Sequence, residues 1–323
     1  MYVVTGGAGF IGSAFIWHLN QLGITDILVV DHLSRSEKWK NLVPLKFRDY
    51  LDRGAFAEKI RGRSLGCIDA VVHLGACSAT TERDADYLMD NNAKWTVELA
   101  QWAAASEVRF VYASSAATYG DGALGFDDTV DLGLLRPLNM YGYSKQLSDI
   151  RLREQGILEQ VAGVKFFNVY GPNEYHKGSM ASVVMHSHST VHKEDGISLF
   201  KSYNQAYADG DQVRDFIYVK DVVDVLYWLV QNKSANGIFN LGTGISRSWN
   251  DLARAVYLAL DKPSVIRYIE IPEGLKGKYQ YFTEAKMDTL RSAGYSKPFL
   301  ALEDGVRDYV LNYLNADRAP LAW

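Results

Sequence analysis

Short apolar runs alternate with longer amphipathic stretches over the first two thirds of the chain. The apolar runs span residues 2–5, 27–30, 70–73, 110–113 and 164–167, and the amphipathic stretches include 9–22, 90–105 and 141–158. Residues 27–30 are apolar without interruption, as in a strand that is covered on both faces. This alternation predicts an α/β fold in which helices flank a parallel sheet.

The pattern becomes less regular after Pro172. It predicts helices over 180–193, 221–230 and 248–260, strands over 216–219, 238–241 and 266–271, and a polar loop over 199–211. Ser248 is suited to cap the start of its helix. Because no Pro/Ser-rich linker interrupts the chain, we expect a second domain to be joined to the first by several crossings. We expect residues 316–323 to form a frayed tail.

Composition and charge narrow the class of protein. The chain has 323 residues, enough for about two domains, and 48% of the residues are apolar. Its net charge is −4 and it has no basic block, so we expect no nucleic-acid partner. Cys67 and Cys77 are too few for a disulfide framework and indicate a reducing compartment. The sequence shows neither a secretory leader nor a long apolar segment, so we expect a soluble, cytoplasmic protein without membrane insertion.

A glycine-rich turn follows the first predicted strand. Residues 5–12 read Thr-Gly-Gly-Ala-Gly-Phe-Ile-Gly, which places Gly6, Gly9 and Gly12 at the spacing Gly-x-x-Gly-x-x-Gly. Glycine allows a tight turn and a close approach to a pyrophosphate, and the start of the following helix attracts phosphate groups. Asp31 ends the second strand, nineteen residues after Gly12. Together these features predict a dinucleotide site in a Rossmann-type, doubly wound parallel sheet.

We expect the chain to form two domains. We expect residues 1–170, with a return contribution from about 214–240, to form the dinucleotide-binding domain. Residues 171–213 and 241–323 should form mainly a smaller α/β substrate domain.

Two dinucleotides are candidates. The Asp31 carboxylate favours NAD, because it accepts hydrogen bonds from a ribose 2′-hydroxyl and repels a 2′-phosphate. Arg35, Lys38, Lys40 and Arg53 favour NADP if they meet that phosphate, and otherwise form a solvated basic loop.

Tyr141 and Lys145 lie four residues apart on one face of a predicted helix. A tyrosine is a weak base at neutral pH, and a nearby ammonium together with a positive nicotinamide ring favours its phenolate. Ser115, at the end of strand 110–113, is placed to hydrogen-bond a substrate hydroxyl beside the tyrosine. A Tyr-x-x-x-Lys pair alone is common by chance, but with Ser115 and the glycine turn it predicts acid/base chemistry on an alcohol.

The sequence resembles the extended short-chain dehydrogenases/reductases, which include nucleotide-sugar epimerases, dehydratases and reductases. The matching segments are 5–12, 73–76, 113–120, 141–145, 167–172, 214–219 and 240–244. More narrowly, the chain is similar to the ADP-L-glycero-D-manno-heptose 6-epimerases in segments 75–82, 137–139, 176–182 and 275–280. This resemblance covers nearly the whole chain, and residues 176–182 are its most specific part.

The resemblance implies a tightly bound NADP that is recycled, with NAD as the second candidate. The family's adenosine-end positions fall on Asp31, His32, Lys38 and Arg53. The family has Asn in place of His32, Lys in place of Arg53 and Glu in place of Leu74, where a backbone contact is therefore expected. The complete set of expected cofactor positions is Gly6, Gly9, Phe10, Ile11, Gly12, Asp31, His32, Lys38, Arg53, Leu74, Gly75, Ala76, Cys77, Ser78, Asn91, Lys145 and Val169.

The resemblance also implies an ADP-heptose substrate and a second catalytic acid/base, Lys177, besides Tyr141, Lys145 and Ser115. From spacing alone, Lys177 is an exposed loop lysine or a phosphate contact. Arg214 suits a diphosphate, with an ion pair to Asp211 or Asp215 as the structural alternative. The expected substrate positions are Ser115, Asn168, Ser179, His186, Phe200, Lys201, Ser202, Tyr203, Arg214 and Tyr279, of which 201–203 adjoin extra residues absent from the family pattern.

The activity that this resemblance implies is inversion of the heptose at C6″, which supplies heptose for the lipopolysaccharide core. The carbon has no acidic proton, so transient oxidation to a planar ketone is the expected route. The alternatives are another nucleotide-sugar epimerase or reductase, for instance a hexose 4-epimerase, and a non-catalytic cofactor-sensing protein of the same fold. We expect a homo-oligomer, a homopentamer being typical of the family. Three histidines, His186, His188 and His192, lack acidic or cysteine partners at persuasive spacing, so we expect no metal site.

Overall fold

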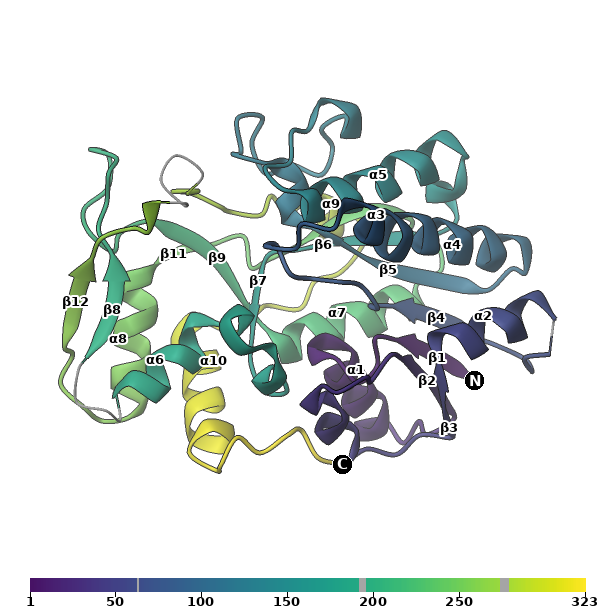
Figure 1. Ribbon diagram of the computed structural model, residues 1–323, viewed down its shortest axis with the longest axis horizontal. Helices are drawn as coiled ribbons and strands as arrows, with labels where there is room; N and C mark the ends of the chain where they lie inside the picture. Colours follow the sequence, from purple (N-terminus) through teal and green to yellow (C-terminus); the bar gives the residue numbers. More distant parts are fainter. Residues whose placement is uncertain (63, 192–195, 274–278) are drawn as a thin grey trace.

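The computed structural model describes residues 1–62, 64–191, 196–273 and 279–323. A parallel sheet of seven strands lies at the centre of its larger part (Figure 1). The strand order is β10-β6-β5-β4-β1-β2-β3, with every neighbouring pair parallel. This is the predicted doubly wound arrangement, and the prediction of a Rossmann-type fold is confirmed. The strands are β1 Tyr2–Thr5, β2 Ile27–Asp31, β3 Asp49–Asp52, β4 Ala70–His73, β5 Arg109–Ser115, β6 Ala162–Phe166 and β10 Gly237–Leu241.

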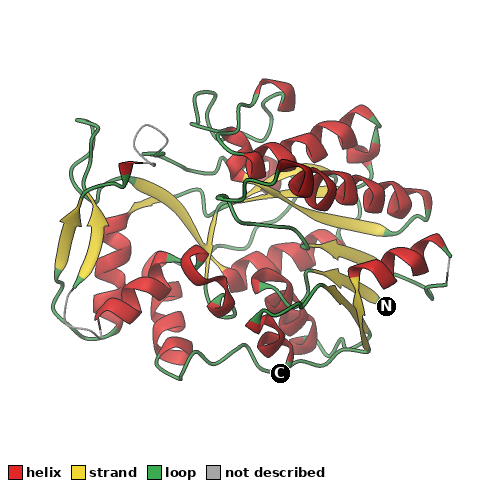
Figure 2. Cartoon of the chain, viewed as in Figure 1, coloured by secondary structure: helices red, strands yellow, loops and turns green. Residues whose placement is uncertain are grey.

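Helices cover both faces of this sheet (Figure 2). The central strands are buried along their whole length, so apolar side chains point to both faces and need a cover on each. One face packs against α1 (Phe10–Gln21) and α7 (Val219–Gln231). The other packs against α2 (Arg53–Arg61), α4 (Trp95–Ala105) and α5 (Met140–Glu154), and α4 follows the short helix α3 (Ala85–Leu88) and one turn of π-helix, Met89–Lys94.

A smaller part lies beyond the carboxyl ends of the strands, at the left of Figure 1. It contains one sheet of order β11-β9-β7 and a parallel pair, β12-β8. Ser248 caps α8 as predicted, in a reciprocal pair of hydrogen bonds with Asp251. The elements of this smaller part are β7 Asn168–Tyr170, α6 Val183–Val191, β8 Ile197–Phe200, β9 Val213–Tyr218, β11 Ser246–Ser248, α8 Trp249–Ala259, β12 Ile266–Ile269 and α10 Leu302–Tyr309. Helix α9 (Asp288–Ser292) packs instead against β10 of the large sheet.

The chain crosses between the two parts several times, as expected. Helix α7 and strand β10 return to the large sheet, whereas β9 pairs with β7 and β11 in the small one. The elements that return to the large sheet, α7 and β10, span residues 219–241. The two-domain division itself remains a prediction.

Local patterns located most elements but missed several. The expected helix 141–158 ends at Glu154, because Gly156 takes a left-handed conformation with φ of 70°. Strands β3, β7 and β11 were not predicted, since each has only three or four residues with little hydrophobic signal. Within the described residues, every helix is too short or too polar to span a membrane. The predicted helix 180–193 is α6, and residues 192 and 193 lie outside the described residues.

The expectation of a frayed tail over 316–323 is wrong. Leu321 is buried, and its backbone N–H donates to Asn173 Oδ1 at 2.9 Å. Trp323 donates from Nε1 to the carbonyl of Asn20 at 2.9 Å, and Tyr175 donates to the carbonyl of Ala319 at 2.8 Å. The tail is fixed by these long-range contacts, which no local sequence pattern encodes.

Candidate active site

The glycine turn joins β1 to α1 with almost no spare volume. A Cβ on Gly6, whose φ is 65°, would lie 2.6 Å from the backbone nitrogen of Gly75. A Cβ on Gly12 would lie 2.8 Å from the carbonyl carbon of Gly6 and still closer to its oxygen. The backbone can approach a ligand closely here, as phosphate binding at the start of a helix requires.

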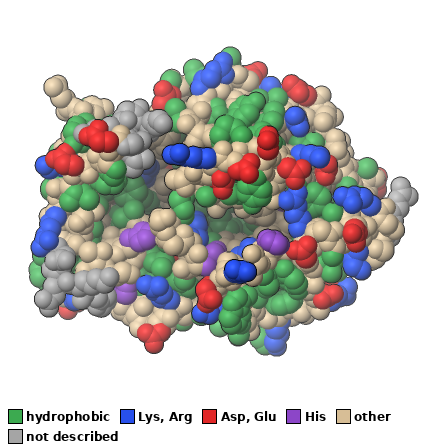
Figure 3. Space-filling model, in the orientation of Figure 1, with side chains coloured by type: hydrophobic (Ala, Val, Ile, Leu, Met, Phe, Trp, Pro, Cys, Tyr) green, Lys and Arg blue, Asp and Glu red, His purple; other side chains and the backbone are tan. Residues whose placement is uncertain are grey.

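A cavity of about 610 Å³ opens at the carboxyl ends of β1 and β4, where the order of strands reverses. The surface is hollowed between the two parts of the molecule on the side shown in Figure 3. We call this cavity the cofactor cleft. The predicted cofactor residues that line it are Gly6, Gly9, Phe10, Ile11, Gly12, Asp31, His32, Lys38, Leu74, Gly75, Ala76, Cys77, Ser78 and Lys145.

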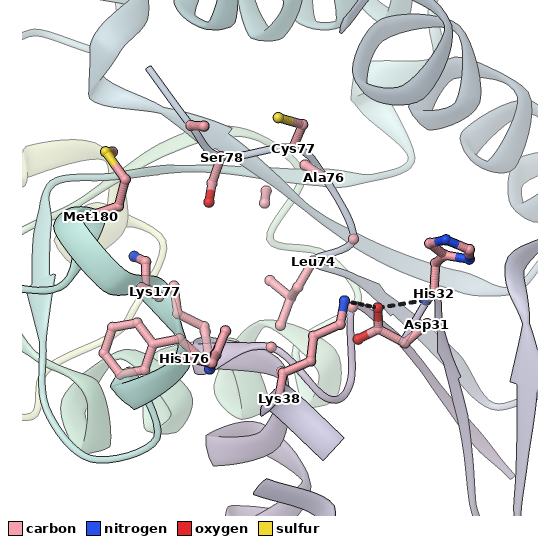
Figure 4. A pocket seen from close by; sticks show the side chains of 18 of the residues that line it. Asp31, His32, Lys38, Leu74, Ala76, Cys77, Ser78, His176, Lys177 and Met180 are labelled. Atoms are coloured by element: carbon pink, nitrogen blue, oxygen red, sulfur yellow. Dashed lines mark hydrogen bonds and ion pairs between the residues drawn. The ribbon is translucent and has the colours of Figure 1, made fainter. Parts of the chain in front are cut away.

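The Asp31 carboxylate organises one end of the cofactor cleft. It accepts hydrogen bonds from the backbone N–H groups of Ala8 at 2.9 Å and His32 at 2.7 Å. Figure 4 shows the Lys38 ammonium directed at the same carboxylate, with an N–O distance of 2.6 Å. The His32 side chain is exposed, and its Nδ1 lies 3.2 Å from Asp52. The Asp31 carboxylate alone would repel a 2′-phosphate, and Lys38 places a positive charge beside it.

Arg53 and Asn91, two predicted cofactor residues, do not belong to the lining of the cleft. Arg53 donates to the side-chain oxygen of Asn91 at 2.6 Å and lies over the Trp95 ring. The remaining predicted cofactor residue, Val169, lines the neighbouring cavity instead. Of the two cations expected at the adenosine end, the geometry brings only Lys38 into the cleft.

Tyr141 and Lys145 extend from the first turns of α5 into the cofactor cleft. Helix α5 begins with an N-cap, in which the Asn139 side chain accepts from the N–H of Gly142 at 2.8 Å. Burial raises the pKa of Tyr141, and its hydrogen bond with Ser115 acts in the opposite direction. Burial lowers the pKa of Lys145 to about 8.

We expected Lys145 and a bound nicotinamide to lower the pKa of Tyr141. In the protein without a cofactor, this pKa is raised. The Lys145 ammonium donates to the carbonyl oxygen of Ala113 at 2.9 Å, and desolvation of the phenol has the larger effect. The positive nicotinamide, the other group in that expectation, belongs to the loaded enzyme.

Lys177 approaches the same region from the loop that follows β7. Its ammonium lies 5.3 Å from the centre of the Phe10 ring, and burial lowers its pKa. The loop is held by the buried Glu174 carboxylate, which accepts from the N–H and the hydroxyl of Ser182, both at 2.6 Å. Lys177 and Tyr141 each line the cofactor cleft and a second cavity of about 320 Å³.

The second cavity, which we call the sugar cavity, contains two of the predicted substrate or catalytic residues besides these two, Ser115 and Asn168, together with Val169, which was predicted to contact the cofactor. Val183 and Trp249 connect it to a third cavity of about 320 Å³, which we call the outer cavity. His186, Phe200 and Tyr279, which were expected around the nucleotide, line the outer cavity. The three cavities therefore share walls: the sugar cavity lies between the cofactor cleft and the outer cavity.

Arg214 is buried behind the outer cavity. Its guanidinium lies between the rings of Trp249 and Tyr279, at 5.6 and 5.2 Å from their centres, and donates to the carbonyls of Val213 and Gln280. The alternative of an ion pair with Asp215 does not match the geometry. Asp215 accepts instead from backbone N–H groups and a hydroxyl of the loop 243–244 and from Ala285.

Other predicted substrate residues lie at the periphery. Lys201 pairs with Glu270 at 2.7 Å, the Ser202 N–H donates to Asp209, and Tyr203 is about half exposed. Ser179 is exposed, and neither it nor residues 201–203 line the three cavities. Their roles stay predictions.

The histidines that were considered as metal ligands make different contacts. His186 lines the outer cavity, and His188 bonds to Asn315 at 2.8 Å, while His192 lies outside the described residues. Residues 275–278 of the matching segment 275–280 also lie outside the described part of the chain.

Sequence reasoning missed several residues of the site. His176 and Met180 line the cofactor cleft, and burial lowers the pKa of His176 to about 4, which leaves its ring neutral. Both belong to the segment 176–182, so the specificity of that segment was a usable signal. Trp249 separates two cavities, but it looks like an ordinary core residue on an amphipathic helix.

A family model described as the NAD dependent epimerase/dehydratase family matches residues 2–242. The chain belongs to this family. Its cofactor is accordingly a nicotinamide dinucleotide, and the glycine cradle and cleft fit one.

Individual relatives narrow the similarity. The chain is 57% identical over 318 residues to the ADP-L-glycero-D-manno-heptose-6-epimerase of Nitratidesulfovibrio vulgaris strain DP4, covering 98% of each chain. It is 51% identical over 325 residues to the protein of the same name from Fusobacterium nucleatum, covering 97% of this chain and 98% of the relative. The crystal structure of the Helicobacter pylori ADP-L-glycero-D-manno-heptose-6-epimerase matches with a TM-score of 0.81 at 26% identity, covering 96% and 95%. The predicted resemblance and the prediction of an isomerase are confirmed.

Proposed function

We propose that this enzyme interconverts ADP-D-glycero-D-manno-heptose and ADP-L-glycero-D-manno-heptose by inverting C6″, and so supplies heptose for the lipopolysaccharide core. The substrate follows from the similarity to enzymes of that name. The observation that carries the proposal is that Tyr141 and Lys177, on separate elements, both line the cofactor cleft and the sugar cavity. Inversion changes the direction of the C6″ oxygen, so two acid/base groups at one junction suit the two directions of proton transfer.

We propose NADP as the cofactor, with NAD as the alternative. The Lys38 ammonium beside the Asp31 carboxylate supports NADP, because it offsets the charge that repels a 2′-phosphate. When bound, the nicotinamide supplies the reversible oxidation of C6″ to a ketone. In this scheme the Gly6–Gly12 backbone holds the pyrophosphate. Tyr141, with Ser115 hydrogen-bonded to it, and Lys177 exchange protons with the C6″ oxygen, and Asn168 holds the sugar.

The function is tested by incubating the purified protein with ADP-D-glycero-D-manno-heptose and with UDP-galactose, without added cofactor. We expect epimerisation of the heptose only. Turnover of the galactose instead indicates a hexose 4-epimerase, and turnover of neither sugar indicates a cofactor-sensing protein. Because the scheme returns to C6″ the hydrogen that it removed, product formed in D₂O carries no deuterium there. Stoichiometric label at C6″ contradicts the scheme.

The two acid/base groups have matched controls. Tyr141→Phe and Lys177→Ala should each lose most turnover, by about 100-fold or more, and retain the nucleotide. Tyr143→Phe alters an exposed tyrosine two residues further along α5, and Lys94→Ala alters an exposed lysine, so both should keep normal turnover. Near-normal activity of Lys177→Ala contradicts the use of two bases.

The cellular setting is also part of the proposal. Both cysteines are free thiols, which is the state that a reducing cytoplasm maintains. A homo-oligomer, with a pentamer as the typical form, is proposed on the family resemblance, and sedimentation equilibrium measures it directly.

A further inference from the structure

A charged pair lies fully buried beneath the catalytic end of α5. Asp149 follows Lys145 by one helical turn, and Lys165 stands on β6; both side chains have essentially no exposed surface. The Lys165 Nζ atom is 3.9 Å from Asp149 Oδ2. Lys165 is the next-to-last residue of β6, close to the carboxyl end of the strand. Neither residue lines one of the three cavities.

The hydrogen bonds of the pair are directed at strand β5. Asp149 accepts from the Tyr112 hydroxyl at 2.9 Å and from the Ser114 hydroxyl at 2.6 Å. Lys165 donates to Thr118 Oγ1 at 2.7 Å, and the Thr118 hydroxyl donates to the carbonyl of Ser115 at 2.8 Å. The network thus surrounds the segment of β5 whose Ala113 carbonyl receives the Lys145 ammonium.

Burying two charges costs several kcal/mol, and packing alone gives little reason to keep them. Lys145 offers a reason. It is 2% exposed, its ammonium donates a hydrogen bond to the neutral carbonyl of Ala113, and burial favours its uncharged form. Among the groups that favour the charged form of Lys145, the Asp149 carboxylate has the largest effect.

The other titratable groups around Lys145 are weaker candidates for this role. Cys77, from the loop after β4, also favours the ammonium, but by less. His73 on β4 is neutral, since burial lowers its pKa to about 3, and Tyr141 on α5 is neutral as a phenol. The Asp128 carboxylate raises the pKa of Lys165, not that of Lys145.

We propose that Asp149, held in its ionised form by Lys165, is a positioning residue that keeps Lys145 protonated at the working pH. Lys145 touches the site, whereas Asp149 acts only through it. In the proposed scheme a protonated Lys145, together with the bound nicotinamide, favours proton loss from Tyr141, so this inference rests on the proposed function for its kinetic consequence. The effect of Asp149 on the pKa of Lys145 does not depend on the substrate.

The test compares pH–rate profiles of Asp149→Asn, Lys165→Gln and the double variant with wild type. Asparagine is nearly isosteric with aspartate but uncharged, so the alkaline limb should move to lower pH by about 1 unit or more. Lys165→Gln should move the limb in the same direction, because Asp149 then binds a proton more readily. The double variant should match Asp149→Asn, since the lysine acts through the aspartate. Asp131→Asn, which removes an exposed carboxylate paired with Arg153, should leave the limb unchanged.

A substrate-independent measurement separates the two proposals. In lysine-labelled protein, NMR gives the pKa of Lys145, whose resonance is assigned by its loss in Lys145→Arg. A lower Lys145 pKa in Asp149→Asn supports the inference even if the wild type turns over no heptose, an outcome that refutes the proposed function alone. An unchanged Lys145 pKa overturns the inference, as does a merely lower melting temperature with an unmoved limb. If Asp149→Asn does not fold, Tyr112→Phe removes one hydrogen bond from Asp149, and the same two readouts decide in the same way.

Discussion

Substitution of Gly12 by alanine tests the proposed phosphate cradle directly. The added Cβ would lie 2.8 Å from the carbonyl carbon of Gly6 and 2.9 Å from the Cα of Gly7. Ordinary contacts begin at 3.4 Å, so the turn would have to open by at least 0.6 Å (3.4 − 2.8). Both neighbours are backbone atoms, which cannot change rotamer. Overpacking of this kind costs about 1–3 kcal/mol, which corresponds to a roughly 5- to 150-fold weaker affinity if the strain is relieved only in the nucleotide-free turn.

The assay measures the nucleotide that is released on denaturation, together with the thermal midpoint. We expect Gly12→Ala to be purified with little bound nucleotide and to bind added NADP at least about 5-fold more weakly. Gly66→Ala is the matched control, because a Cβ there meets nothing within 4 Å and its φ is not positive. Wild-type nucleotide content and melting temperature in Gly12→Ala would refute the assignment of the turn as a tightly fitted cradle.

Three further perturbations follow from the contacts of the site. Lys38→Ala should lower the affinity for NADP about 10-fold or more, because a charge-assisted contact is worth about 1.5–3 kcal/mol, whereas Arg53→Ala should change this affinity little. Equal losses of affinity in titrations of the two variants would contradict the placement of Arg53 outside the cleft. Glu174→Gln should lower the melting temperature by several degrees, because the two hydrogen bonds from Ser182 lose their charged acceptor. An unchanged melting temperature in a calorimetric scan would show that Glu174 does not stabilise the loop. Wild-type turnover should fall as pH rises through about 8, because the active form of Lys145 is protonated and deprotonates there, so a rate that stays flat to pH 10 would exclude a need for its charge.

Much of the fold was accessible from the sequence because its signals are local. Apolar runs identify β1, β2, β4, β5 and β6, since most positions of a strand that is buried on both faces are apolar. Strand β3, by contrast, is partly exposed at the sheet edge and has the sequence Asp-Tyr-Leu-Asp, which gives no such run. Its place in the sheet depends on pairing with β2, a contact between segments about twenty residues apart.

The site divides in the same way. The sequence by itself determined the glycine turn, the aspartate at the end of β2 and the Tyr141–Lys145 face of α5, because each depends on spacing along one element. Only the tertiary structure decided that Lys177 meets Tyr141 at the same two cavities, that Arg53 bonds to Asn91 and lies outside the cleft, and that the tail is fixed beneath α1. These outcomes depend on pairings such as β7 with β9 and on desolvation, which also reverses the expected direction of the Tyr141 pKa in the protein alone. Spacing specifies which residues share a face, whereas burial and long-range packing determine what that face meets.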